Sequence, residues 1–568
     1  MSASDSSTVS APSPHAPPER KPGARGGLIL LALVVLVAVW AFWPKTVEVT
    51  SEFAEHSGLN LDLHKPDALI ESQHLARLPR DLLKVPVLHD LLSEDFVFYY
   101  EGNADRLGVV GTLRRIAYEH ELEWRDELVA EMLDDSAQIA LWRGSDGKLA
   151  HALLRLRLGT MAQIGKSLAE VAAKDTQLQQ VAVIRGAGEA VPVYRLRYGW
   201  ERAVLLAGVD DQLLVFTSPA LLEADDEAAG QLGKAQVEQL DELLRGKPVF
   251  APRFALSALQ GEHRISVSTD YLAMGYGRLL PQWAAVRAEF DGEQWSAFMA
   301  VQDLDAAAVE FAPLWSAMPD APAACVAVPV SREALKAVLG KLSLAQSFPT
   351  ALADQLGGPA ALCWYADSRL HTPLLVTRLR GEAKADDAAL GEAFGQMIGT
   401  PEPSYGDQPF AVDVSQQDGQ VHWSRRVTSL WGVHAAAEAD NAENLEGRRY
   451  FDVGLARHGE MLLFSLDNRL VTKAVATLDR RYPPVAERLP DGVVPALVAP
   501  QRLATLLEAE VLNSLPEDVE SIFRNAAEAH LLPKLRAMGT HPNIAMGLPA
   551  DVAGDDDAQW VPVTWTQW

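Results

Sequence analysis

The sequence predicts an α+β protein in which one N-terminal transmembrane helix precedes a two-lobed ectodomain of antiparallel sheets with packed helices. Three observations predict this fold class. A long apolar run lies near the start, hairpin-like strand pairs outnumber single strand–helix alternations, and two pairs of segments resemble each other along the chain. At 568 residues the chain is also too long for one ordinary core.

The transmembrane helix is predicted at residues 26–44, which contain no charged side chain. As a helix, the part from Gly27 to Trp43 spans roughly 25 Å at about 1.5 Å per residue, enough for one pass. Two alternatives are a buried core helix and a signal peptide cleaved near Val39-Trp40-Ala41, where bulky aromatic residues disfavour cleavage. No later run is as apolar, so we expect a single pass.

The flanking charges predict the orientation. Arg20, Lys21 and Arg25 precede the apolar run, whereas glutamates follow Lys45. The positive-inside rule then places the N-terminus in the cytoplasm and the ectodomain in the periplasm, with the inner membrane contacted through residues 26–44.

The remaining chain divides by composition. Residues 1–25 are rich in Ser, Ala and Pro and are expected to be a disordered cytoplasmic tail. Residues 45–75 are expected to be a linker, residues 76–310 a first α+β lobe, and residues 311–568 a second α+β lobe.

Net charge limits the partners. The formal net charge of −26 makes the ectodomain soluble and repels nucleic acid, so we expect no nucleic-acid partner.

Turn chemistry predicts two strand groups. Asp146-Gly147 supplies the turn of a hairpin within Ile139–Arg157, and Val193–Thr217 reads as a meander of three strands. Apolar periodicity predicts helices between the strand groups. The predicted helical stretches are Ile116–Leu133, Met161–Ala173, Leu221–Leu244, Arg332–Leu342 and Leu503–Leu512.

Two internal similarities indicate a duplication. Gln212–Asp225 and Glu460–Ala474 each read as a strand followed by a helix. Met318–Pro329 and Leu489–Pro500 each place Pro-Asp before an apolar strand, and Leu78-Pro-Arg-Asp resembles a third, degenerate copy. In the second pair we expect Val326 and Val328 to face the core as Leu497 and Val498 do. Chance in an Ala- and Leu-rich chain is the alternative.

The chain has two cysteines, Cys325 and Cys363, both in apolar, strand-like runs. In an oxidising periplasm they could form a disulfide if their Cα atoms lie within about 7 Å. The alternative is two small buried side chains that never meet.

Two motifs match catalytic patterns in the wrong context. Gly159–Ser167 resembles a phosphate-binding loop, but five residues separate its glycines where four are needed. Ser145 and Lys148 fit Ser-x-x-Lys, yet they lie in the predicted hairpin turn and not at a helix N-terminus. We therefore interpret both as structural.

No catalytic, cofactor-binding or metal-binding residue is assigned from the sequence. The 14 histidines are scattered, and Asp555-Asp556-Asp557 is interpreted as a solvated acidic run. We expect no cofactor. Carboxylate pairs for glycoside hydrolysis depend on three-dimensional spacing and stay open.

The end of the chain is rich in tryptophan. Alternation in QWVPVTWTQW predicts a final strand with Val561, Val563 and Trp565 on one face. We expect these aromatic residues to pack in the core, although exposed Trp can also bind sugars or proteins.

The apolar anchor, the segment Leu78–Asn103 and the Trp-rich end together resemble an uncharacterised family of proteobacterial envelope proteins, a domain of unknown function. The resemblance covers most of the chain after the anchor and implies no activity, cofactor or site residue. Family members resemble proteins encoded near bacterial alpha-2-macroglobulin-like protease traps, which implies an accessory role.

Two functional hypotheses follow. The first is a membrane-tethered periplasmic protein without catalytic activity that binds or scaffolds another envelope protein. The second is a periplasmic hydrolase acting on peptide or glycan through carboxylates assembled by the fold. The sequence favours the first, because no catalytic constellation is recognisable in it.

Overall fold

The computed structural model describes the chain from residue 62 onward with gaps. Apart from single positions, the described residues are 62–91, 136–157, 171–184, 191–198, 202–209, 212–217, 247–273, 280–304, 309–330, 356–379, 386–399, 411–428, 450–514, 527–552 and 558–568. The predicted tail, the predicted transmembrane helix at 26–44, Gly159–Ser167 and Asp555-Asp556-Asp557 lie outside them. So do three predicted helices, Ile116–Leu133, Leu221–Leu244 and Arg332–Leu342, except for isolated positions of the second.

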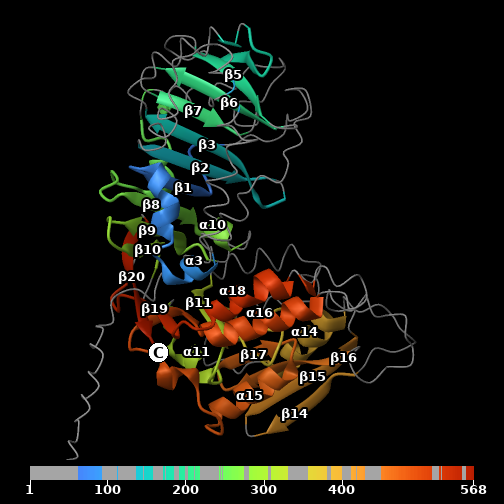
Figure 1. Ribbon diagram of the computed structural model, residues 1–568. Coiled ribbons are helices and arrows are strands. Elements are labelled where there is room, and N and C mark those ends of the chain that lie inside the picture. The colour runs from blue at the N-terminus through green and yellow to red at the C-terminus, as the bar shows by residue number, and fades with distance from the viewer. Residues whose placement is uncertain are drawn as a thin grey trace, which may run out of the picture.

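The described strands form one sheet of 20 strands. Every pairing is antiparallel, and helices pack against the sheet (Figure 1). The prediction of an α+β protein built on antiparallel sheet is therefore confirmed for the described residues.

The first ten strands pair in the order β4-β5-β6-β7-β3-β2-β1-β8-β9-β10. We call them unit 1. Their bounds are β1 (Ala68–Ser72), β2 (Ala137–Arg143), β3 (Leu149–Arg157), β4 (Leu178–Ile184), β5 (Val191–Tyr198), β6 (Arg202–Val209), β7 (Gln212–Phe216), β8 (His263–Ser268), β9 (Trp283–Phe290) and β10 (Trp295–Val301).

The last ten strands, unit 2, pair in the order β14-β15-β16-β17-β13-β12-β11-β18-β19-β20. Their bounds are β11 (Ala324–Pro329), β12 (Leu356–Trp364), β13 (Leu374–Leu379), β14 (Asp413–Gln417), β15 (Gln420–Thr428), β16 (Tyr450–His458), β17 (Met461–Ser465), β18 (Val493–Val498), β19 (Ile544–Leu548) and β20 (Gln559–Gln567).

Unit 2 repeats the strand order of unit 1. Adding ten to each strand number of unit 1 gives the order of unit 2, including the step in which the third strand pairs with the seventh. Ten successive strands in the same non-sequential order indicate an internal duplication. The predicted lobe boundary at residues 310 and 311 falls between β10 and β11.

β20 joins the two units. Gln559 to Val563 pair with β10, and Thr564 to Gln567 pair with β19. Figure 1 shows β20 running beside both strands. The units are also in contact where α3 (Pro86–Leu91) packs against α18 (Leu532–Met538).

The two sequence similarities have different outcomes. The first falls on β7 and β17, which occupy equivalent places in the two units and each complete a hairpin with the preceding strand. The second falls on β11 and β18, which are not equivalent. They lie side by side in unit 2, and Cys325 pairs with Leu497.

One orientation expected for the second similarity differs from the structure. On β11 the buried side chains are Cys325 and Ala327; Val328 is half-buried and packs against the main core as expected, whereas the half-buried Val326 does not. The reason is that Cys325 and Ala327 face the main core of unit 2, to which Leu497 also belongs. Val498 packs on the opposite face, against the helices.

The Asp146-Gly147 hairpin is confirmed for the described residues. β2 and β3 pair around it, and Gly147 takes a φ of 77°, which glycine adopts without a Cβ penalty. The Asp146 carboxylate accepts a hydrogen bond from the backbone N–H of Lys148 at 3.0 Å. The predicted meander is also present as β5, β6 and β7.

Among the described residues, the helices are short in unit 1 and longer in unit 2. The predicted helix Leu503–Leu512 lies within α16. Besides α3 and α18, the described helices are η3 (Leu75–Arg77), α2 (Leu78–Leu82), α9 (Ala251–Phe254), α10 (Thr269–Leu272), α11 (Ala312–Ala317), α14 (Asp387–Gly399), α15 (Asn468–Leu478), η10 (Val485–Arg488), α16 (Pro500–Ser514) and η11 (Ala527–Leu531).

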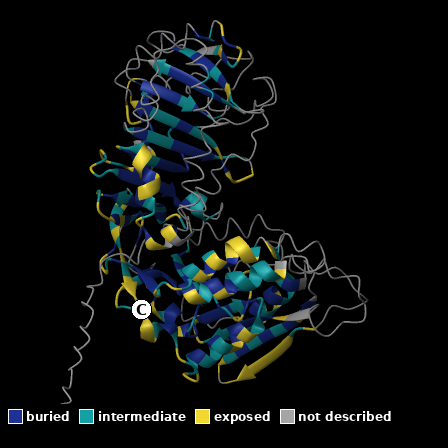
Figure 2. Ribbon diagram, in the orientation of Figure 1, coloured by how far each residue is buried: buried dark blue, intermediate teal, exposed yellow. Residues whose placement is uncertain are grey.

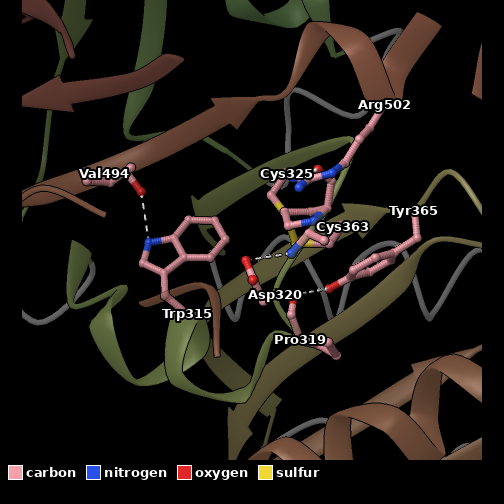
Figure 3. The surroundings of a disulfide bond; sticks show 10 residues. Trp315, Pro319, Asp320, Cys325, Cys363, Tyr365, Val494 and Arg502 are labelled. Carbon is pink, nitrogen blue, oxygen red and sulfur yellow. Dashed lines mark hydrogen bonds between the residues drawn. A yellow bond between two sulfur atoms is a disulfide. The ribbon is translucent and has the colours of Figure 1, made fainter. Parts of the chain in front are cut away.

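A disulfide joins Cys325 and Cys363. The sequence leaves open whether these two residues meet, and the structure shows that they do. The two residues lie directly opposite each other on β11 and β12, with Cα atoms 4.1 Å apart. Figure 3 shows that the disulfide lies between the side chains of Trp315 and Tyr365. The indole N–H of Trp315 donates a hydrogen bond to the Val494 carbonyl. The disulfide is thus part of the core of unit 2.

Two further expectations concern the N-terminal part. β1 lies within residues 45–75, for which the sequence predicts a linker, yet it is paired on both sides by β2 and β8. Within the described part of the chain, none of the helices has the length and apolar character needed to cross a bilayer.

Candidate functional site

A buried polar cluster lies where β1 and β8 meet α2. Ser72 is the last residue of β1 and His263 the first of β8, and the two lie directly opposite each other. Asp81 reaches them from α2, which covers this face of the sheet. His263 has no exposed surface, and Ser72 and Asp81 are also buried.

The three side chains form a continuous hydrogen-bonded chain. His263 Nε2 lies 3.0 Å from Asp81 Oδ2, and His263 Nδ1 lies 2.8 Å from Ser72 Oγ. A carboxylate only accepts, so Nε2 carries the proton and Nδ1 accepts from the Ser72 hydroxyl. Ser72 Oγ itself accepts from the backbone N–H of His74 at 3.1 Å. Each polar atom in this chain is therefore satisfied.

An ammonium group balances the carboxylate of Asp81. Lys84 Nζ lies 2.7 Å from Asp81 Oδ1 and 4.5 Å from the centre of the Phe290 ring. Glu262 stands beside His263, and one ligand atom from each of Asp81, Glu262 and His263 falls within 4.8 Å of the others. These three residues could hold a metal ion, because imidazole and carboxylate are common ligands of divalent metals.

Aromatic rings close the site on the sheet side. Phe290 lies opposite His263 across β8 and β9, and the two rings stack with centroids 5.7 Å apart. Trp295 lies opposite Phe290 on β10 and donates from Nε1 to the backbone carbonyl of Asp81 at 2.9 Å. The indole thereby fixes α2 over the cluster.

Burial and hydrogen bonding shift the pKa values of Asp81 and His263. Burial lowers the pKa of His263, which the neighbouring Asp81 carboxylate only partly offsets, and the imidazole is neutral near pH 7. Burial alone would raise the pKa of Asp81, but hydrogen bonds from Lys84 and His263 hold it below its usual value. Asp81 is therefore the charged member of the pair.

A second set of charged groups lies on the other face of the same strands. Arg264, next to His263 on β8, is bonded to Glu71 at 3.0 Å and to Glu289 at 2.7 Å. Glu71 also accepts from Gln138 on β2 at 3.0 Å. Arg287 on β9 also lies 3.4 Å from Glu289, so two arginines balance two glutamates across β1, β8 and β9, and we interpret this set as structural.

Unit 2 offers an internal comparison for both sets. β11 and β18 are the counterparts of β1 and β8, and their paired residues are all apolar. The pairs are Ala324 with Val498, Cys325 with Leu497 and Val326 with Ala496. These pairs lie at the end of the ladder that corresponds to Ala68, but every residue of β11 and of β18 is apolar, so the polar residues where β1 ends and β8 begins are a specific feature of unit 1.

Ser72, His263 and Asp81 have the residue types of a nucleophilic triad. Catalysis would need the serine hydroxyl to reach a substrate, but only 2% of Ser72 is exposed. Its hydroxyl proton is also already donated to His263 Nδ1. In this conformation the hydrogen-bonded side chains of Ser72, His263 and Asp81 hold α2 on the sheet, and the Ser72 hydroxyl is not accessible to a substrate.

The sequence analysis assigned no site residues and did not find this cluster. Ser72, Asp81 and His263 are separated by up to 191 positions and share no motif. Of the motif residues interpreted as structural, Lys148 lies in the exposed hairpin turn, while Ser145, Lys166 and Ser167 lie outside the described residues.

The fold and the cluster define a class: a duplicated antiparallel β-sheet protein with a polar cluster confined to one of its two units. Comparison with protein families then places it. A model of the family described as "Uncharacterized protein conserved in bacteria (DUF2138)" matches residues 25–565, so the chain belongs to that family.

One relative is similar over nearly its whole length. The uncharacterized protein YfaA of Escherichia coli (strain K12) is 37% identical over 555 residues, which cover 95% of this chain and 97% of the relative. Among solved structures, a crystal form of TP0453 matches 43% of this chain and 79% of its own at 11% identity, with a TM-score of 0.20. That likeness is too small to carry an argument.

The hydrogen-bonded chain generates a stability prediction with a matched control. Ser72→Ala should lower the free energy of unfolding by about 1–3 kcal/mol, because it leaves the buried His263 Nδ1 without its hydrogen-bond donor. Ser266→Ala is the control, since Ser266 lies on the same strand and its Oγ has no partner among the described residues. Urea unfolding should show Ser266→Ala unchanged or more stable. Equal losses in the two variants would contradict the role given to Ser72.

The pKa of His263 generates a pH prediction. Because its folded-state pKa lies below the ordinary value of 6.5, the unfolded chain takes up a proton first as the pH falls. The contribution of neutral His263 is thus present above about pH 6.5 and is lost below it. Urea unfolding at pH 7.5 and at pH 5.5 should show this loss in the wild type and a smaller one in His263→Gln. An unchanged pH dependence in the variant would show that other groups cause the loss.

Proposed function

We propose that this protein is a membrane-tethered periplasmic protein that binds or scaffolds another envelope protein. Residues 1–25 form a cytoplasmic tail, residues 26–44 span the inner membrane once, and the two units lie in the periplasm. The uncharged run and the basic residues before it support this topology.

The disulfide supports the compartment. Disulfides persist in the periplasm and other oxidising environments and are rare in the cytosol. Cys325 and Cys363 are the two cysteines of the chain, and each lies opposite the other in the core of unit 2. The disulfide therefore favours an oxidising compartment over the cytosol.

The observation that carries the binding function is the free edge at β14. Among the described residues β14 pairs along one edge only, with β15, and all five of its side chains are exposed (Figure 2). Val414 is 60% exposed. An unpaired row of backbone N–H and C=O groups is a template for an added strand.

We infer that an extended segment of an envelope protein adds to β14. Backbone hydrogen bonds would supply affinity, and the pattern of side chains would supply specificity. The resemblance to proteins encoded beside alpha-2-macroglobulin-like protease traps makes such a trap system a candidate partner. The net charge of −26 disfavours nucleic acid as the ligand.

The second candidate function is a periplasmic hydrolase. The observation that favours it is the Ser72–His263–Asp81 chain, which has the composition of a catalytic triad. Carboxylates assembled by the fold remain the other route to hydrolysis, as the sequence analysis expected. The burial of Ser72 and the ion pair of Asp81 with Lys84 favour the binding function over this one.

The topology generates a prediction that uses the disulfide. When whole cells are denatured, the full-length chain should show both cysteines protected from a thiol-alkylating reagent until a reductant is added. Deleting residues 26–44 should keep the chain in the cytoplasm, where both cysteines react after denaturation without reductant. Alkaline phosphatase fused after Ser51 should be active. An inactive fusion, or a bridged deletion variant, would refute the proposed topology.

The binding edge generates a second prediction. Neighbouring residues of a strand direct their N–H groups to opposite edges, so Val414→Pro and Ser415→Pro each remove a different donor. One of the two should abolish cross-linking of the full-length protein to its partner in membranes while leaving the disulfide and the unfolding transition intact. The other should weaken the pairing with β15. Capture of the same partner by both variants at the wild-type level would exclude β14 as the site.

A further inference from the structure

The cluster of Asp81, Glu262 and His263 has the composition of a metal site. One imidazole and two carboxylates bring their ligand atoms within 4.8 Å of one another. We propose that these three residues bind a divalent transition-metal ion of the zinc class, with Lys84 giving way to it. The ion would be held between α2 and the start of β8.

The distances suit such an ion after a small adjustment. Ligand atoms about 2.1 Å from a tetrahedral zinc ion lie about 3.4 Å apart. His263 Nε2 and Asp81 Oδ2 are 3.0 Å apart, close to this spacing. The backbone of Glu262 is held by hydrogen bonds to Phe290 and Gln73, so the half-buried Glu262 would approach the ion by rotation of its side chain alone.

The imidazole is already oriented for coordination. Metal-bound histidines use their second ring nitrogen for a hydrogen bond that fixes the ring. Ser72 Oγ occupies this position, 2.8 Å from His263 Nδ1. When the ion takes the lone pair of Nε2, the imidazole proton moves to Nδ1 and the Ser72 hydroxyl turns to accept it. The ring stays neutral and releases no proton.

Space for the third ligand comes from a glycine. A Cβ on Gly292 would lie 3.2 Å from Glu262 Oε1, so a side chain there would crowd the carboxylate. Gly292 also has a φ of 106°, which favours glycine. Phe290 and Trp295 line the sheet side and exclude water from the imidazole.

Lys84 is the counter-cation that the metal replaces. Its ammonium lies 2.7 Å from Asp81 Oδ1, and 49% of its side chain is exposed. A lysine this exposed can turn into solvent at little cost, because a surface ion pair stabilises by about 0–1 kcal/mol. Lys84 therefore competes with the metal for Asp81 and sets the affinity.

Unit 2 indicates that the polar cluster of unit 1 has a role other than building the sheet. The counterparts of β1 and β8 in unit 2, β11 and β18, pair with each other and consist of apolar residues alone. The polar ligands are thus not needed to build the sheet. Since α3 follows Lys84 directly and packs on α18, an ion fixing α2 would also fix the contact between the two units.

The test is a zinc titration of the full-length protein in detergent after removal of metals with a chelator. Competition against a chromophoric zinc indicator should give one ion per chain, and cobalt should give a visible absorption band that zinc abolishes. Glu262→Gln should weaken zinc binding tenfold or more. Glu293→Gln is the matched control, because Glu293 is exposed, lies nearby and is not in the cluster.

Lys84→Ala separates the proposal from a purely structural role for the cluster. Removing the competing ammonium should tighten zinc binding, whereas a structural ion pair predicts only lower stability. Three results would overturn the proposal: no binding at micromolar zinc by the folded wild type, equal affinities of Glu262→Gln and Glu293→Gln, or weaker binding by Lys84→Ala. Unfolding curves recorded with each titration establish that every variant is folded.

Discussion

The backbone of β20 has to form hydrogen bonds with strands of both units, β10 and β19. Its first half completes the ladder of β10 and its second half that of β19, so each unit has its inner edge paired only because this strand is present. An unpaired backbone edge is costly when buried and adhesive when exposed. The side chains agree with this double use: Trp560 donates to the Phe254 carbonyl in unit 1, whereas Val561, Val563 and Trp565 pack against the core of unit 2.

Local chemistry made part of this fold predictable. A turn residue that tolerates positive φ marks the hairpin at Gly147, and alternating side chains mark β20 and place Val561, Val563 and Trp565 on one face, as the sequence predicts. The order of the strands was not predictable, because pairing between β3 and β7, or between β10 and β20, joins residues far apart in the chain. The Pro-Asp pattern misled for the same reason: it reports how a strand begins and not where that strand lies in the sheet.

The site was invisible in the sequence for a related reason. Ser72, Asp81 and His263 are ordinary residues at unrelated positions, and they meet only through the register of β1 and β8. Their interest appears when the two units are compared. The equivalent strands β11 and β18 of unit 2 consist of apolar residues alone, whereas β1 ends and β8 begins with polar residues, so the sheet forms without the polar cluster. Duplication here supplies a control that a single copy of the fold would lack.

The place of β20 at the end of the described strands also affects how the protein is made. A chain synthesised from its N-terminus contains β10 and β19 before the strand that pairs with both has been made. Throughout that interval β10 and β19 each carry an open edge. Chains that stop short of residue 559 keep both edges open permanently, so proteases can distinguish them from finished molecules by their exposed backbone.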